Sequence, residues 1–341
     1  MNWNYGNGRP GGELGAVRLL ADGLVANPDA LASVRDYIDT ATGLRAMEVR
    51  LAGGLSFEVF PDRGLDIGST WWNGSPISWR SPHDLSTTAS IAANSSWLAR
   101  WSGGLVTTCG PDNIGPERDG YPMHGSHHST RASNVRWTRS SLGDQLSIVI
   151  TGSISNFELF ERQVVVHREI EAGTGNASIE IRDRISNDGN TVAAVPLMYH
   201  VNFGAPFLQP GGVVRMPPAV TTSQESGRLV KDPVTFPQPT KRTRHAGFEH
   251  KLSESSQGDS CATLYDPSMR RRVAVSWTSS SLPRLYQWRW LSRGGWVLSV
   301  EPSNAPLFGA DREGQFAGAP LLEPGESFST RLRIQCEEEA K

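Results

Sequence analysis

Hydrophobic and polar residues alternate with a period of two in short segments along much of the chain. Because successive side chains of a strand point to opposite faces of its sheet, this alternation predicts β-strands. In one segment, for example, Ile179, Ile181 and Asp183 fall on the same face. The segments with this pattern are Leu55–Phe60, Gln145–Ile150, Gln163–Ile170, Ala177–Arg184, Thr191–Met198, Arg272–Thr278, Tyr286–Trp290, Trp296–Val300 and Phe328–Gln335.

Turn-forming residues separate these segments, at 187–190, 210–212, 292–295 and 323–326. Helical patterns are rare, and only Asp29–Tyr37 and Asp84–Ala93 suggest helices. Many strands without alternating helices predict an all-β fold, an antiparallel sandwich or barrel, and the lack of a fixed-period repeat disfavours a propeller. We expect a single domain over residues 1–341, with residues 1–45 as an N-terminal appendage packed on it.

The bulk composition narrows the class of protein. The 341 residues include 33 Lys and Arg against 35 Asp and Glu, a net charge of −2. This balance argues against nucleic-acid and membrane partners, and the short basic cluster at 241–244 (KRTR) is expected to be a solvated loop. Three scattered cysteines form no disulfide framework or zinc spacing, and no secretion signal or membrane span is visible. A soluble, cytoplasmic protein is therefore expected.

Three of the eight histidines lie in one segment, YPMHGSHHSTRASNV at 121–135. They are His124, His127 and His128, and imidazoles there can serve as metal ligands, sugar-binding groups or loop residues. Adjacent residues of a strand point to opposite faces, so all three converge only if the segment is a loop. Exposed loop positions are the favoured interpretation for His127 and His128. The alternatives are sugar contacts at the mouth of a cleft, with His128 as the candidate binding residue, and metal binding together with His124.

An ordered set of motifs resembles a known family. The motifs are PDRGLDIG at 61–68, GGLVTTCGPDNIG at 103–115, PMHG at 122–125, PLMYHVNF at 196–203, WVLSVEP at 296–302 and LEPGES at 322–327. Over roughly residues 45–335 the chain resembles the aldose 1-epimerase, or galactose mutarotase-like, superfamily and is most similar to its DUF4432 branch. The resemblance implies a β-supersandwich of antiparallel sheets with a few short helices. It also implies a reaction that opens and recloses a cyclic hemiacetal with one acid and one base.

The resemblance also assigns roles to three residues. Glu301, at the end of an apolar strand, matches the general base of the family, and His200 matches the general acid. His124 matches a histidine that binds sugar hydroxyls, and Gly125 after it allows a positive φ or a close approach. Without the resemblance, we would expect Glu301 to be a solvent-facing acid, His200 a core histidine and His124 a turn residue.

Further candidates for substrate binding come from the residue types themselves. Arg63 offers a fork of donors to a sugar, or it pairs with Asp62 or Asp66 to hold its turn. Asp66 is a second candidate that also suits a turn cap, and Asn113 beside Asp112 is a plausible hydroxyl partner. The tryptophans at 71, 72, 97, 101, 288 and 290 offer faces for sugar stacking. One or two of them are expected to face the site, with Trp288 the first choice, and the others are expected in the core. Cys109 is expected to be buried packing.

Three functions follow from these residues. The first is anomer exchange on a free sugar by Glu301 and His200, which are expected to face each other across a cleft, with no cofactor. The second is a metal-dependent sugar isomerase or lyase, in which His124, His128, His200 and Glu301 hold a divalent metal. The third is a non-catalytic sugar-binding protein. The expected partner is a small carbohydrate, and exposed strands are compatible with a homodimer.

Overall fold

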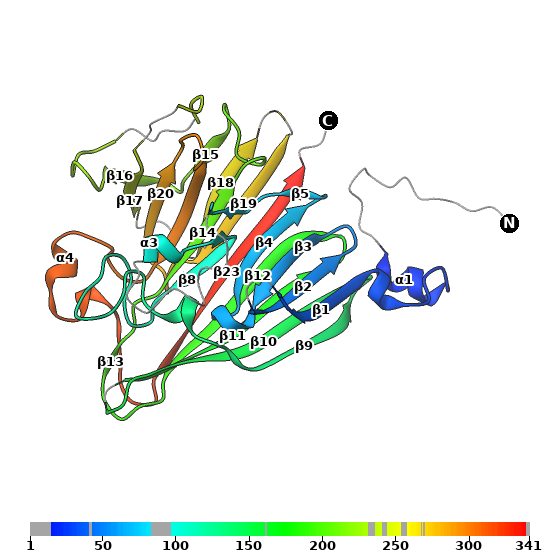
Figure 1. The fold of residues 1–341 in the computed structure, drawn as a ribbon, viewed down its shortest axis with the longest axis horizontal. Helices are drawn as coiled ribbons and strands as arrows, with labels where there is room; N and C mark the ends of the chain where they lie inside the picture. The colour runs from blue at the N-terminus through cyan, green and yellow to red at the C-terminus, as the bar shows by residue number, and fades with distance from the viewer. Residues whose placement is uncertain are drawn as a thin grey trace.

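The computed structural model describes residues 15–40, 43–82, 97–160, 162–230, 236–240, 244–253, 258–266, 268 and 270–338, without the side chains of residues 99, 100 and 315. Antiparallel strands dominate this part of the chain, which folds as a galactose mutarotase-like sandwich of two large sheets (Figure 1). Among the described residues, no helix is long and apolar enough to cross a membrane.

The larger sheet has eleven strands, in the order β1-β2-β3-β4-β8-β14-β21-β20-β17-β16, with β5 beside β4. Its strands are β1 (Ala32–Ile38), β2 (Arg45–Leu51), β3 (Leu55–Phe60), β4 (Asp66–Trp72), β5 (Ser75–Pro76), β8 (Val106–Cys109), β14 (Met198–Gly204), β16 (Ala219–Ser223), β17 (Ala246–Leu252), β20 (Arg284–Trp290) and β21 (Val297–Ser303).

The second sheet has eight strands, in the order β15-β18-β19-β23-β12-β11-β10-β9. They are β9 (Ser133–Leu142), β10 (Gln145–Phe157), β11 (Gln163–Gly173), β12 (Asn176–Asn187), β15 (Val213–Arg215), β18 (Asp259–Asp266), β19 (Arg271–Thr278) and β23 (Ser327–Glu338). Two small pairs complete the strands, β6 (Trp79–Arg80) with β7 (Gly103–Gly104) and β13 (Ala193–Ala194) with β22 (Leu321–Leu322).

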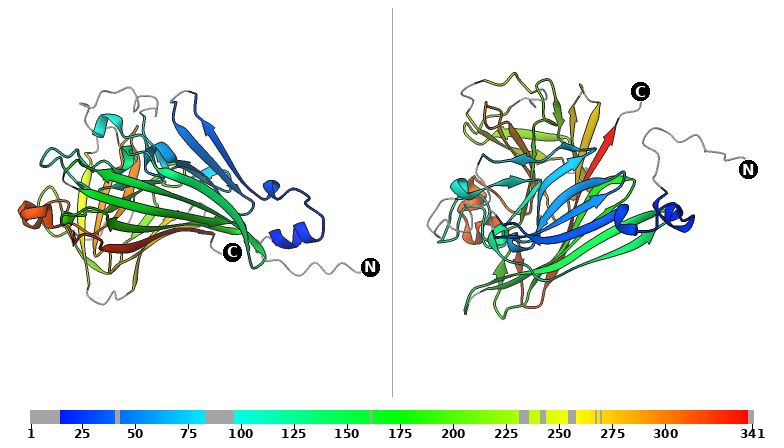
Figure 2. Two further views of the ribbon diagram at one scale, coloured as in Figure 1. Left: turned by 90° about the horizontal axis from the view of Figure 1, so that it is seen from below. Right: turned by 45° about the vertical axis from the view of Figure 1, so that its right-hand side comes forward.

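The described helices are short and lie outside the sheets. They are α1 (Ala16–Ala21), α3 (Trp97–Arg100) and α4 (Ala310–Glu313), with single 3₁₀ turns η1 (Pro28–Ala30), η2 (Pro61–Arg63), η3 (His127–Ser129) and η4 (Gln315–Gly318). The two sheets lie one over the other (Figure 2), and the alternating apolar side chains of each fill the space between them.

Two expectations from the sequence are wrong in this structure. Asp29–Tyr37 is not a helix: after η1 it continues as β1, because antiparallel pairing with β2, from Ala32 opposite Leu51 to Ile38 opposite Arg45, outweighs local propensity. Residues expected in an appendage thus supply an edge strand of the larger sheet. Thr191–Met198 is not one strand either, because Pro196 has no N–H and the chain turns between β13 and β14. The expected helix at Asp84–Ala93 lies outside the described residues.

A buried ionic cluster lies between the sheets. Arg168 of β11 pairs with Asp183 of β12 at 2.6 Å and with Asp66 of β4 at 3.1 Å, and its side chain is fully buried. It also donates to the hydroxyl of Thr108, and the Tyr199 hydroxyl donates to Asp183 at 2.7 Å. Thr108 and Tyr199 are neighbours in the middle of the larger sheet. The cluster therefore connects β8 and β14 of this sheet to β11 and β12 of the other.

Candidate active site

His200 and Glu301 lie side by side in the middle of the larger sheet. They come from adjacent strands, β14 and β21, whose register pairs Met198 with Ser303 and Val201 with Val300. The His200 Nε2 atom lies 3.1 Å from a carboxylate oxygen of Glu301, and both side chains are nearly fully buried. The two groups expected to face each other across a cleft are therefore in direct contact on one wall.

A second layer of hydrogen bonds holds this pair. Asn202, two residues after His200, accepts from His200 Nδ1, while its own amide nitrogen donates to the Gly104 and His200 carbonyls. Ser299, two residues before Glu301, donates its hydroxyl to the Glu301 carboxylate. Side chains two residues apart on a strand share a face, so each strand brings both a titratable side chain and the partner that orients it.

An aromatic cavity of about 430 Å³ opens above the pair. Its volume falls within the range of small-molecule sites, about 300–1,000 Å³. Beyond the pair, the described lining is mainly apolar and includes Trp79, Trp97, Trp101, Trp288, Trp290, Met123, Phe248, Leu307 and Phe308. Among the described lining residues there is no arginine and no lysine. The cavity therefore suits an uncharged ligand with an apolar face.

His124 also lines this cavity, as a neutral imidazole. Burial is the main cause that holds its pKa well below the usual value, and His200, His128 and Arg312 lower it further. Its Nδ1 accepts a hydrogen bond from the Gly115 N–H at 3.3 Å, so in the neutral ring the hydrogen is on Nε2. The backbone of His124 is left-handed, with φ +63°, and so is that of Gly125, with φ +73°. Such backbones for non-glycine residues cluster at functional sites.

The other predicted binding residues do not reach this cavity. Arg63 and Asp66 line a separate hollow of about 120 Å³, where Arg63 donates to the Ser102 hydroxyl at 2.7 Å. Burial raises the pKa of Asp66 to about 6, opposed by Arg168 and by hydrogen bonds from Thr108. Arg63 is thus engaged with Ser102, and Asp66 with Arg168 and Thr108, and sugar binding by either residue stays a prediction.

Asn113 is likewise occupied in its own loop. Its amide nitrogen donates to the Pro116 and Pro122 carbonyls at 2.9 Å each, and its oxygen accepts from Arg312 at 2.9 Å. Asp112 accepts from the backbone N–H groups of Asn113 and Ser126. These side chains therefore fix the loop that carries His124, and Asn113 lines a hollow other than the aromatic cavity.

The expectation that His127 and His128 are exposed is wrong, because both are buried. Their 3₁₀ turn η3 packs against η2, where His127 Nε2 donates to the Gly64 carbonyl at 3.0 Å. A Cβ on Gly64 would lie 2.5 Å from the His127 ring, so this contact depends on glycine. The His128 ring lies 6.2 Å from that of Trp97, and His128 is not among the described residues that line the cavity.

The proposed metal ligands are not gathered into a binding site. Within the described residues, no group of three or more His, Cys, Asp or Glu side chains is arranged to hold a metal ion. His124 lies beside His200, with ring centroids 5.8 Å apart, but His200 Nε2 is directed at Glu301. The predicted metal ligands therefore do not surround a common point at which a metal ion could bind; they are His124, His128, His200 and Glu301. Cys109 is buried, as expected, and burial raises the pKa of its thiol well above the usual value.

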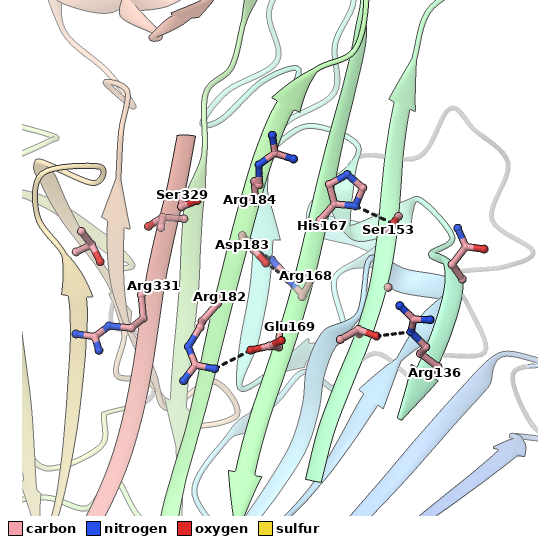
Figure 3. Close-up of a pocket in the computed structure, with 15 residues that line it drawn as sticks. Arg136, Ser153, His167, Arg168, Glu169, Arg182, Asp183, Arg184, Ser329 and Arg331 are labelled. Carbon is pink, nitrogen blue, oxygen red and sulfur yellow. Dashed lines mark hydrogen bonds and ion pairs between the residues drawn. The ribbon is translucent and has the colours of Figure 1, made fainter. Parts of the chain in front are cut away.

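A larger hollow, of about 940 Å³, lies on the outer face of the eight-stranded sheet (Figure 3). It is open to solvent, and arginines from several strands line it, among them Arg136, Arg182, Arg184 and Arg331. Arg182 is held by Glu169, Glu171 and Glu180, and Arg331 by Asp259. This surface carries exposed ion pairs, whereas His124, His200 and Glu301 meet in the smaller aromatic cavity.

Sequence reasoning missed several parts of the site. Four of the six named tryptophans line the cavity, more than the one or two expected, together with Trp79. Trp72 lies in the core. The partners Asn202 and Ser299 were also missed, although their spacing of two from His200 and Glu301 on strands was a readable signal.

Comparisons with known proteins agree with this fold. A family model described as a domain of unknown function (DUF4432) matches residues 41–336. A putative aldose 1-epimerase from Klebsiella pneumoniae has 21% identity and a TM-score of 0.81, over 90% of this chain and 84% of its own. A galactose mutarotase-like protein from Clostridium acetobutylicum has 15% identity and a TM-score of 0.64, over 91% and 100%. A galactose mutarotase related enzyme from Lactobacillus acidophilus has 13% identity and a TM-score of 0.55, over 89% and 98%. None of the curated proteins matches this chain.

Proposed function

This chain belongs to the DUF4432 family, a domain of unknown function, and we propose that it is an aldose 1-epimerase-like enzyme that interconverts the anomers of an uncharged sugar. The observation that carries the proposal is the contact between His200 Nε2 and the Glu301 carboxylate, at 3.1 Å, on the wall of an aromatic cavity. The names of the similar structures from Klebsiella and Clostridium support the same class of substrate.

The hydrogen bonds support a proton shared between His200 and Glu301. The Asn202 amide nitrogen donates to two carbonyls, so its oxygen faces His200 and Nδ1 of that ring carries a hydrogen. The short distance from Nε2 to Glu301 then requires one further proton between the two groups. With this proton on Nε2, Glu301 is a carboxylate that can act as base and His200 is an acid.

Anomer exchange needs this protonation state. The Glu301 carboxylate takes the proton of the anomeric hydroxyl, the C1 oxygen forms a carbonyl, and the bond between C1 and the ring oxygen breaks. His200 Nε2 gives its proton to the departing ring oxygen. Rotation about the C1–C2 bond presents the other face of the carbonyl, and the reverse proton transfers close the ring as the other anomer. Both oxygens are bonded to C1, so the acid and base must lie close together, as they do here.

The cavity supports this reaction on a neutral sugar. Aromatic rings stack on the apolar faces of sugars, and burial in the cavity strengthens each hydrogen bond to the reacting oxygens. A phosphate or carboxylate substituent would lack a cationic partner among the described lining residues. Neutral aldoses are therefore the expected substrates, and their phosphates and uronic acids are expected to be poor ones.

The test is a screen of free aldoses for anomer exchange above the uncatalysed rate, by polarimetry of freshly dissolved single anomers. Glu301→Gln keeps the size of the side chain and removes the base, so the enzymatic rate should fall by about 10²–10⁴-fold. The variant should still bind sugar and unfold in urea as the wild type does. A wild-type protein that binds sugars without accelerating exchange would instead be a sugar-binding protein, the third hypothesis from the sequence.

A further inference from the structure

The indole N–H of Trp97 differs from its neighbours in the cavity wall. Trp79 donates its N–H to the Gly295 carbonyl at 2.8 Å, and Trp101 donates to the Thr107 hydroxyl at 3.0 Å. Trp97 is 5% exposed, and its Nε1 is buried with no acceptor in the described part of the chain. Leaving a buried donor unsatisfied costs about 1–3 kcal/mol, and buried tryptophans usually find a partner. An unsatisfied donor beside a cavity indicates an acceptor that enters with a ligand.

His124 supplies a second donor at the same place. Its ring packs edge-on against Trp97, with centroids 4.5 Å apart. Because Nδ1 is occupied by the Gly115 N–H, the hydrogen of the neutral ring is on Nε2, and none of the described residues accepts it. Two side chains that each carry an uncharged donor, from α3 and the 121–125 loop, therefore pack together in the lining of the cavity.

The distances to His200 show which part of a sugar this wall would meet. The His200 ring centroid lies 6.2 Å from that of Trp97 and 5.8 Å from that of His124. The anomeric carbon must lie at His200 and Glu301 if these perform the proton transfers. The two rings that carry the donors then lie about 6 Å from the acid, a separation that favours a hydroxyl elsewhere on the same sugar ring over the anomeric oxygen.

We infer that Trp97 Nε1, together with His124 Nε2, donates to one non-anomeric hydroxyl oxygen of the sugar, and that Trp97 makes this hydroxyl a determinant of specificity. The inference rests on the proposed function, since it uses His200 and Glu301 to place the anomeric carbon. Neutral donors suit a hydroxyl oxygen; a phosphate or carboxylate oxygen would call for a cation. Trp97 is a binding and positioning residue and takes no part in proton transfer.

The experiment compares Trp97→Phe with Trp296→Phe. Both remove one indole N–H, but Trp296 lies outside the cavity and donates to the Leu208 carbonyl at 2.7 Å. The probes are D-glucose, D-galactose, D-mannose, L-fucose and L-rhamnose, with the 2-, 3-, 4- and 6-deoxy analogues of the probe that binds best. Calorimetric affinity and anomer-exchange rate are both measured.

In the wild type, one deoxy analogue should bind at least about ten-fold more weakly than its parent sugar, because the hydrogen bonds from both Trp97 and His124 are lost. Trp97→Phe loses only one of the two bonds, so it should weaken the parent by a smaller factor, discriminate less against that analogue, and bind the analogue no worse than the wild type does. Trp296→Phe should retain the wild-type pattern.

The inference is overturned if Trp97→Phe and the wild type show the same relative affinities for the parent sugar and its deoxy analogues. That result would mean that the Trp97 N–H meets only water and no sugar hydroxyl. Sugar binding without anomer exchange would overturn the proposed function while the deoxy comparison still decides the inference. No binding of any of the five sugars would overturn both.

Discussion

Replacing Arg168 by methionine tests the interpretation of the ionic cluster between the sheets. The change removes the cation that faces Asp66 and Asp183, whose side chains are 9% and 0% exposed, and leaves two buried carboxylates without a counter-charge. Breaking a buried ion pair in this way costs about 3–5 kcal/mol, because the remaining charge cannot return to water. We expect Arg168→Met to lower the free energy of unfolding by this amount at pH 7, measured by urea denaturation followed by tryptophan fluorescence.

The matched control is Arg182→Met, on the next strand. Arg182 makes ion pairs with three glutamates, but its side chain is 43% exposed, so its loss should cost at most about 1 kcal/mol. The triple variant Arg168→Met, Asp66→Asn, Asp183→Asn removes the uncompensated charges and should recover most of the lost stability. The reasoning is refuted if Arg168→Met costs no more than Arg182→Met, or if the triple variant is no more stable than the single one.

Three further predictions concern the loop that carries His124, the loss of stability at low pH and the reactivity of the cysteine thiols. Gly125→Ala should lose at least about 1–3 kcal/mol in urea unfolding, because φ is +73° and a Cβ would lie 2.3 Å from Asp112 Oδ1; an unchanged midpoint would contradict this. Burial lowers the pKa of His250 to about 4, so the unfolded chain binds its proton first and stability falls as pH drops from 6.5 to 4. The cost of His250→Asn should accordingly shrink by up to about 3 kcal/mol between pH 7 and pH 4, as seen in urea titrations at both pH values. Cys261 is the exposed thiol and Cys109 is buried, so iodoacetamide should label Cys261 first in the native protein, as read by peptide mass spectrometry; early labelling of Cys109 would count against the burial.

Much of the fold follows from period-two patterning in the sequence. β3 has the predicted bounds, Leu55–Phe60, because its alternation ends in Pro61 and a tight turn. Edge strand β1 was not predicted, because its seven residues carry a pattern that also suits a helix. Only pairing with β2 decides between helix and strand. Where one strand's identity depends on a distant strand, local periodicity lacks the information.

The buried ionic cluster between the sheets was predictable from the alternation patterns of two strands. Asp183 shares a face with Ile179 and Ile181, which predicts a buried carboxylate that needs a buried cation. In β11, Arg168 shares a face with Val164, Val166 and Ile170, the complementary pattern. Reading the two strands together would have predicted the pair.

The candidate site was likewise predictable from the sequence only in part. His200, Glu301 and His124 could be named because each stands in a short motif that resembles a family. The aromatic wall could not be assembled, because Trp79, Trp97 and Trp288 come from three segments far apart in the sequence and nothing local distinguishes a cavity tryptophan from a core one. Asn113 and Arg63 stand in the same kind of motif, but loop geometry directs them elsewhere.

The most direct test of the central claim is a comparison of anomer-exchange rates for the wild type, His200→Gln, Glu301→Gln and the double variant, on the best free aldose from the screen. If the two residues act as one acid–base pair with a shared proton, either single change should remove about 10²–10⁴-fold of the rate, and the double variant should be no slower than the singles. Single variants that keep the wild-type rate, or losses that multiply fully in the double variant, would contradict the account.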